Sequence, residues 1–134
     1  MQDWKINIDQ VPEELQEWSW REGNYKRYRQ HVSVALGNTE EDPHPFDVEL
    51  TRLPPGARPC PVHAHSHRWE FFMIVSGQAI VQRDGETTEA VQGDCLMQPP
   101  GTRHRIGNAS ETEDLVYYFI SNEYEEDSGE RFEV

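Results

Sequence analysis

The chain has 134 residues, a length typical of one domain with a core of its own. Hydrophobic residues make up 35% of it, which argues against global disorder, and its formal net charge of -13 argues against a nucleic-acid partner. The sequence has no apolar run long enough for a membrane helix, and residues 1–5 lack the pattern of a signal peptide, so we expect a cytoplasmic protein without a membrane partner.

Residues 1–24 are predicted to form an N-terminal extension with a short helix. Pro12 is followed by two acidic residues, a composition typical of a first helical turn. Three tryptophans, Trp4, Trp18 and Trp20, also lie in this extension. A monomer rarely leaves so much apolar area exposed, so we expect these side chains to pack across the interface of a homodimer.

Residues 25–121 show the pattern of many short strands. Apolar and polar residues alternate over 32–36, which predicts a half-buried strand. A second alternating run predicts a strand at 46–51, and short runs bounded by turn signals predict further strands at 71–75, 79–81, 87–91, 95–97 and 115–120. Turn signals such as Asp84-Gly85 separate these runs, and the arrangement predicts an all-β fold, either an antiparallel sandwich or a closed barrel. Residues 122–134 are predicted to form a loose acidic tail.

Three histidines occupy alternate positions, His63, His65 and His67, and Glu70 follows them. On an extended segment the side chains of residues i and i+2 point to one face, so a pair of these imidazoles can bind one ion. His104 follows later in the chain, and a barrel can bring it to the same interior point. Imidazole and carboxylate ligands together suit one divalent transition metal, which we expect to be iron, manganese, zinc, nickel, cobalt or copper.

The same residues resemble the two motifs of the cupin family. The first motif is glycine, five residues, His-x-His, three or four residues, glutamate, six residues and glycine. With one extra residue after the first glycine, it is met by Gly56, His63, His65, Glu70 and Gly77. The second motif is glycine, five residues, Pro-x-Gly, two residues, histidine, three residues and asparagine. It is met by Gly93, Pro99, Gly101, His104 and Asn108.

The resemblance implies a small antiparallel jelly-roll barrel, also called a double-stranded β-helix, that is often a homodimer. It also implies a metal bound by His63, His65, Glu70 and His104. Cupins include dioxygenases, decarboxylases, lyases, sugar-type isomerases and proteins that only bind a ligand, so the fold does not settle the activity. Our first hypothesis is a metal-dependent enzyme that acts on a small polar or anionic metabolite. The alternative is a module that binds a small molecule or the metal without catalysis.

Residues near the motifs are candidates for contacts with the substrate. Arg103 and Arg105 flank His104 and are expected to attract an anion such as a carboxylate or a phosphate. Tyr117 is a candidate catalytic residue, as a general acid or as a partner for an oxyanion, if its hydroxyl points inward. Further candidates for substrate contacts are His67, Phe72 and Met97.

Several residues of the motif regions have structural interpretations. Asn108 is expected to hold a turn through a bond from its side chain to the backbone. Cys60 and Cys95 are too few for a disulfide framework, so we expect two reduced thiols that pack as small side chains. His67 is expected to lie exposed or beside the ligands, although a shifted pair of histidines would make it a ligand in place of His63.

Overall fold

The computed structural model describes residues 4–122 and 126–134. The strands are β1 (Glu13–Trp20), β2 (Gly23–His31), β3 (Phe46–Leu53), β4 (Val62–His65), β5 (Glu70–Ser76), β6 (Gln78–Arg83), β7 (Glu86–Val91), β8 (Cys95–Gln98), β9 (His104–Asn108), β10 (Leu115–Asn122) and β11 (Gly129–Glu133). The helices are the 3-10 turn η1 (Ile8–Gln10) and α1 (Val32–Ala35). No helix in the described part of the chain has the length and hydropathy needed to cross a membrane.

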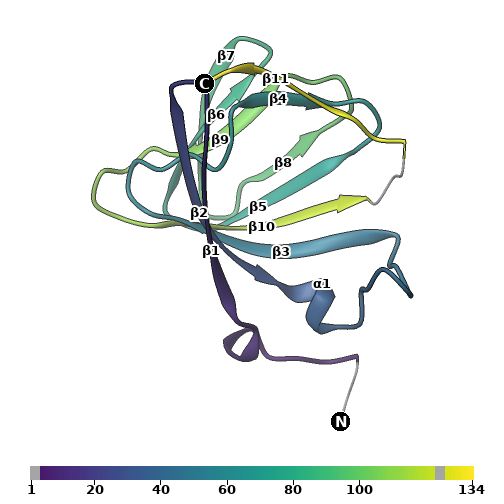
Figure 1. The fold of residues 1–134 in the computed structure, drawn as a ribbon. Helices are drawn as coiled ribbons and strands as arrows, with labels where there is room; N and C mark the ends of the chain where they lie inside the picture. Colours follow the sequence, from purple (N-terminus) through teal and green to yellow (C-terminus); the bar gives the residue numbers. More distant parts are fainter. Residues whose placement is uncertain (1–3, 123–125) are drawn as a thin grey trace.

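The strands form two antiparallel sheets that face each other (Figure 1). One sheet has six strands in the order β1-β2-β3-β10-β5-β8, and the other has five in the order β11-β4-β9-β6-β7. The predicted all-β antiparallel jelly-roll barrel is therefore confirmed.

An apolar core lies between the sheets because side chains alternate in direction along each strand. On β10, Leu115, Tyr117 and Phe119 are buried, and the residues between them are half-buried. The core as a whole consists of Leu53, Phe72, Ile74, Ala79, Val81, Ala90, Ile106, Leu115, Tyr117 and Phe119. Ser121 of β10 continues this inner face and is paired with Glu70 of β5. Polar side chains therefore replace the apolar core where β10 ends and β5 begins.

Residues 13–20 form strand β1, so the predicted short helix is wrong. β1 pairs with β2 along its whole length, and the two strands make a long hairpin at one side of the molecule (Figure 1). Gln16, Trp18 and Trp20 lie on its half-buried side. The signal for a helix start is a weak local preference, and pairing with β2 outweighs it. The six-stranded sheet therefore extends beyond the predicted barrel limit at residue 25.

The predicted strand over 32–36 is also wrong, because Val32–Ala35 form the single turn of α1. Ser33 is the buried residue of this turn. Its hydroxyl donates to the carboxylate of Asp47 and accepts from the N–H of Val48 at 3.0 Å, which fastens α1 to the start of β3. An alternation of apolar residues this short does not distinguish a strand from one helical turn.

The predicted loose tail contains a strand, β11, which pairs with β4. Gly129 lies opposite His65 in this pairing. An uncovered edge of β4 would leave backbone groups without partners, and β11 supplies those partners. The five-stranded sheet therefore extends beyond the predicted barrel limit at residue 121. Residues 123–125 of the predicted tail lie outside the described part of the chain.

Candidate metal centre

The predicted metal ligands come from three strands in the two sheets. His63 and His65 lie two residues apart on β4, and both line the interior of the barrel. His104 is the first residue of β9 and the direct partner of His63. Glu70 is the first residue of β5, in the opposite sheet. We call these four residues the His–Glu cluster.

Three imidazole nitrogens of the cluster converge on one oxygen of Glu70. Glu70 Oε1 lies 2.6 Å from Nε2 of His104 and 3.6 Å from Nε2 of both His63 and His65. Ligand atoms of His63, Glu70 and His104 all lie within 4.8 Å of one another, so these three residues form a compact group that could hold a metal ion. His65 stands slightly apart, since its ring centroid is 6.5 Å from that of His104.

The opposite nitrogens of His63 and His104 are held by backbone carbonyls. Nδ1 of His63 lies 3.0 Å from the carbonyl oxygen of Pro61, and Nδ1 of His104 lies 2.9 Å from that of Thr102. A carbonyl oxygen only accepts hydrogen bonds, so both Nδ1 atoms carry a proton. The lone pair of each neutral ring is therefore on Nε2, the atom that faces Glu70.

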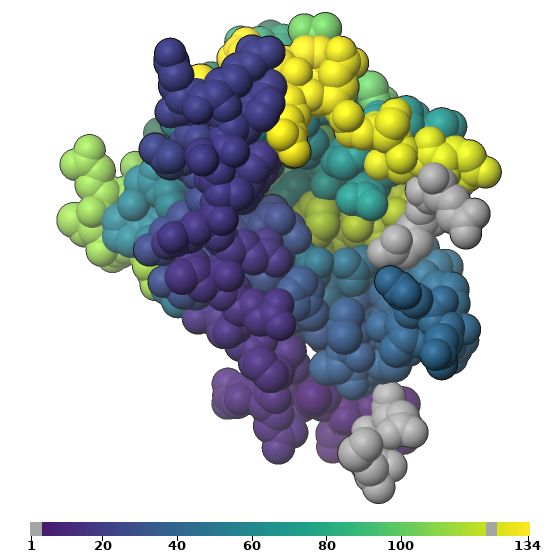
Figure 2. Space-filling model, viewed as in Figure 1, coloured from purple at the N-terminus to yellow at the C-terminus, as the bar shows by residue number. Residues whose placement is uncertain are grey.

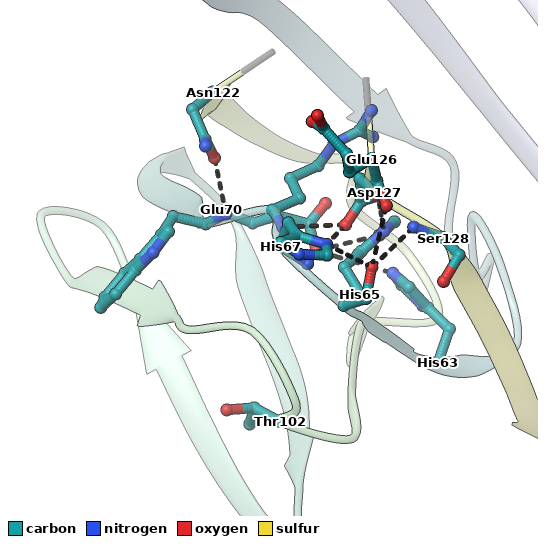
Figure 3. Close-up of polar contacts among 12 residues, drawn as sticks. His63, His65, His67, Glu70, Thr102, Asn122, Glu126, Asp127 and Ser128 are labelled. Atoms are coloured by element: carbon teal, nitrogen blue, oxygen red, sulfur yellow. Dashed lines mark hydrogen bonds and ion pairs between the residues drawn. The ribbon is translucent and has the colours of Figure 1, made fainter. Parts of the chain in front are cut away.

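Asp127 supports His65 in the same way (Figure 3). Its Oδ2 lies 2.8 Å from Nδ1 of His65, and its Oδ1 accepts from the backbone N–H groups of His67 and Arg68, both at 2.8 Å. Asp127 precedes β11 by two residues. The C-terminal segment therefore fixes the orientation of one predicted ligand.

The donor atoms of the cluster fit a divalent transition metal. Inward-facing imidazole nitrogens with a carboxylate are typical ligands of such ions, and an acceptor on the opposite imidazole nitrogen is their usual support. Without a cation or a proton between them, the Nε2 lone pairs and the negative charge of Glu70 would repel one another. The cluster is thus built to surround a positive charge.

The charge states of the cluster follow from its burial and its close contacts. Burial alone would raise the pKa of Glu70, but the hydrogen bonds with His104 and His63 outweigh it and hold that pKa well below its usual range. Burial also opposes the charged form of His63, yet contacts with the Cys60 thiol and with Glu70 raise its pKa to about 10. Burial lowers the pKa of His65. In the metal-free protein Glu70 is therefore an ionised carboxylate held by close contacts with His104 and His63.

The His–Glu cluster borders a cavity of about 470 Å³ inside the barrel. A cavity of this size admits a small metabolite. The space-filling view shows a hollow between the β1–β2 hairpin and β11, and residues of both elements line the cavity (Figure 2). Phe72 and Tyr117, two of the predicted substrate or catalytic residues, also line it.

Two predicted substrate residues, Arg103 and Arg105, are not among the residues that line the cavity. The Arg103 guanidinium lies 3.8 Å from the ring centroid of Phe132, and Arg105 donates to Oε1 of Gln82 at 2.9 and 2.6 Å. The reason is the period of a strand: residues one position before or after His104 point away from the face that His104 occupies. Closeness to a ligand in the sequence therefore misled the prediction.

His67 and Met97 do not line the cavity either. His67 follows the end of β4, so the alternation that aligns His63 with His65 stops before it. It is exposed, with Nδ1 at 2.8 Å from the Ser66 hydroxyl. Met97 is 48% exposed and lies on the outer face of β8.

Sequence reasoning missed several residues at the cavity. Arg27 and Arg29 of β2 line it, as does Cys60, whose sulfur lies 3.6 Å from Nδ1 of His63. The two arginines occupy alternate positions of one strand, which was the available signal that they share a face. Asp127 gave no such signal, because it lies in a run of acidic residues.

Comparisons with known proteins agree with this fold. A crystal structure of a sugar phosphate isomerase from Silicibacter pomeroyi has a TM-score of 0.80 at 21% identity, covering 97% of this chain and 82% of that chain. A crystal structure of a predicted oxalate decarboxylase from Thermotoga maritima has a TM-score of 0.70 at 18% identity, covering 90% of this chain and 99% of that one. The search of curated proteins finds no match. The family model described as Cupin domain matches residues 49–121, more than half of the sequence, and the chain therefore belongs to the cupin family.

Proposed function

We propose that the protein is a metal-dependent enzyme that acts on a small polar or anionic metabolite. The His–Glu cluster would hold one divalent transition metal, and the cavity beside it would bind the substrate. The observation that carries the proposal is the convergence of three Nε2 atoms on Glu70 while each opposite nitrogen is held by a protein acceptor. When bound, the metal supplies a positive charge that polarises a carbonyl or carboxylate group.

Glu49 is the residue we propose for moving a proton. It lines the cavity on β3, and its Oε2 lies 2.8 Å from Nε of Arg29. Burial is the largest influence on its pKa and raises it, although the charge of Arg29 opposes the rise. A carboxylate with a raised pKa can take up and return a proton near neutral pH.

Tyr117 is the residue we propose as a hydrogen-bond donor to the substrate. Burial raises the pKa of its hydroxyl above the usual value, so the group stays protonated. Such a hydroxyl is suited to support a negative charge that develops on a substrate oxygen. It is less suited to the role of general acid.

Isomerisation of an anionic sugar derivative is our first choice of reaction, and decarboxylation is the second. Two solved structures with this fold are a sugar phosphate isomerase and a predicted oxalate decarboxylase, and both names describe anionic substrates rich in oxygen. An isomerase that moves a proton between neighbouring carbons needs an acid–base group in the cavity that holds the metal, and Glu49 lines that cavity. Glu49 supports the first choice for that reason.

Elemental analysis of the purified protein tests the metal centre. We expect about one transition metal ion per chain, lost from the His104→Ala variant because that substitution removes a ligand. The matched control is His44→Ala, since His44 lies in the loop before β3 and outside the cluster. Absence of metal from the wild type, or equal metal in the wild type and His104→Ala, would contradict the proposal.

Turnover by the metal-loaded protein tests the activity. We expect conversion of a sugar phosphate, followed by NMR of the reaction mixture, with oxalate as the second substrate class. Glu49→Gln should lower kcat by at least about 100-fold, in line with the loss of an acid–base group, while the metal content stays unchanged. A protein that binds metal and substrate without turnover would instead be the non-catalytic binding module.

A further inference from the structure

Two arginines on the inner face of β2 differ in how their charges are balanced. The Arg29 guanidinium lies against Glu49, with Nε at 2.8 Å from Oε2. Arg27 instead donates from Nε to the neutral amide oxygen of Gln16 at 2.6 Å. Within residues 4–122 and 126–134, no carboxylate forms an ion pair with Arg27. Of the two arginines on this strand, Arg27 is therefore the one whose guanidinium has no ion-pair partner in the described part of the chain.

The two guanidiniums are close enough to influence each other. Burial is the largest influence on Arg27 and lowers its pKa, and the positive charge of Arg29 lowers it further. The negative charge of Glu49 acts in the opposite direction. A guanidinium nonetheless stays charged in proteins, so the folded chain holds two like charges side by side at the cost of stability. An anion placed between them would relieve that cost.

The arginines and the His–Glu cluster face the same cavity. Arg29 is the cross-strand partner of Thr51, and Thr51 is also the partner of Tyr117, so Arg29 and Tyr117 lie in one row across the inner face of the sheet. Cys60 also lines this cavity, and its sulfur lies 3.6 Å from Nδ1 of His63. A small molecule in the cavity can therefore contact both the two arginines and the His–Glu cluster.

The other arginines that line the cavity contact an aspartate or aromatic rings. Arg68 approaches Asp127, with Nε at 3.9 Å from Oδ2. Arg131 is exposed and stacks over the rings of Trp18 and Trp20, at 4.7 and 5.8 Å from their centroids. Arg27 and Arg29 are thus the pair best placed for a ligand in the interior.

We propose that Arg27 and Arg29 form a subsite for an oxyanion, the carboxylate or phosphate group of the substrate, whose other end reaches the His–Glu cluster. A guanidinium offers paired N–H donors that match the oxygens of either group. Glu49 holds Arg29 in place, and Arg27, which forms no ion pair in the described residues, supplies the attraction. The inference rests on the proposed function only in assuming that the cavity receives a substrate, because the subsite itself needs no metal.

Calorimetric titration of inorganic phosphate into EDTA-treated, metal-free protein tests the subsite. We expect Arg27→Gln to raise the Kd for phosphate at least about tenfold, because a charge-assisted hydrogen bond is lost. The matched control, Arg103→Gln, removes an arginine outside the cavity and should change the Kd by less than about twofold. Titration of malonate in parallel distinguishes a carboxylate site from a phosphate site by which anion binds more tightly.

The Arg27→Lys variant distinguishes a loss of phosphate binding from a folding defect in Arg27→Gln. It keeps the positive charge but loses the paired donors, so we expect a Kd between those of the wild type and Arg27→Gln, with a thermal unfolding midpoint close to that of the wild type. Equal Kd values in the wild type, Arg27→Gln and Arg27→Lys would overturn the subsite. So would binding that requires added metal and disappears in His104→Ala. Loss of the metal site alone would overturn the proposed function and leave the subsite standing.

Discussion

His63 and His65 both point Nε2 at Glu70, but they are supported by different groups. His63 donates to a backbone carbonyl, whereas His65 donates to the carboxylate of Asp127 at 2.8 Å. A carboxylate partner makes an imidazole a stronger ligand and fixes the plane of its ring. Asp127 should therefore matter for metal affinity although it never touches the ion.

The Asp127→Asn variant tests this role. We expect it to weaken metal binding by about 10- to 100-fold, the usual cost of losing a group that supports a ligand, as measured by competition with a chelator of known affinity. Asp84→Asn is the control, because the Asp84 carboxylate accepts from the backbone N–H of Arg103 and is not part of the cluster. Equal affinities in the wild type and Asp127→Asn would show that His65 needs no such support.

A second prediction about a single residue concerns the proton on His63. In the metal-free protein its pKa is raised from 6.5 to about 10. The resulting stabilisation of the fold is complete below pH 6.5 and is lost as the pH rises towards 10, because the folded state then holds a proton that the unfolded state releases. The metal needs the same Nε2 lone pair and must displace that proton.

We therefore expect opposite pH trends in two measurements between about pH 6 and pH 9. Metal affinity, measured by chelator competition, should rise with pH, and the thermal unfolding midpoint of the metal-free protein should fall. In the His63→Gln variant, the thermal unfolding midpoint of the metal-free protein should no longer fall as the pH rises. Metal affinity that is constant over this range would contradict the prediction.

At the scale of elements, the strands and turns that could be predicted are those that depend on residues close together in the sequence. The two-residue alternation located β3, and a continuous apolar run located β10. The motif glycine Gly77 has φ of 90° at a position where a Cβ would collide with the carbonyl oxygen of Asp114. Asn108 holds its turn as predicted, donating to the carbonyl oxygens of Leu53 at 3.0 Å and Glu113 at 2.7 Å.

The parts that were not predictable depend on partners far away in the sequence. β11 is a strand because β4 offers it an open edge, and β1 is a strand because β2 returns beside it. The residues of the site also fall into a predictable group and an unpredictable group. The His–Glu cluster was predictable from motif spacing, whereas the arginines of the cavity wall depend on which face of β2 points inward, and no local signal settles that.

The β1–β2 hairpin gives a prediction for truncated chains. A chain that begins at Asn24 lacks β1 and the hydrogen bond from Trp18 Nε1 to the carbonyl oxygen of Pro59, at 3.2 Å. We expect its thermal unfolding midpoint to fall by at least about 5 °C, because β2 becomes an open edge. A chain that begins at Asn7 keeps β1 and should match the full chain. Equal midpoints for all three would show that β1 contributes little to the fold.

At the scale of the whole molecule, the outer face of the six-stranded sheet exposes apolar side chains on β5 and β8. Met73 and Val75 of β5 are each 37% exposed, and Met97 of β8 is 48% exposed. Of the tryptophans predicted to pack across a dimer, Trp18 packs on Tyr25 of the same chain with 4.9 Å between ring centroids, whereas Trp4 is 76% exposed. We propose that the homodimer forms through the outer sheet face.

The Met73→Glu variant tests this interface. We expect the wild type to sediment as a dimer and Met73→Glu as a monomer, because a buried and unpaired carboxylate would be costly at the centre of an apolar contact. Val91→Glu is the control, since Val91 is 50% exposed on β7 of the other sheet. A wild type that sediments as a monomer, or a variant that remains dimeric, would contradict the proposal.

The contact between His65 and Asp127 also bears on when an ion can be acquired during synthesis. The two residues are 62 positions apart, so His65 leaves the ribosome well before its partner. Until Asp127 and β11 have closed over β4, a nascent chain offers ligands that are neither aligned nor supported. An ion held by the proposed centre is therefore selected by the folded barrel, and the metal found in the protein should reflect the compartment in which folding ends.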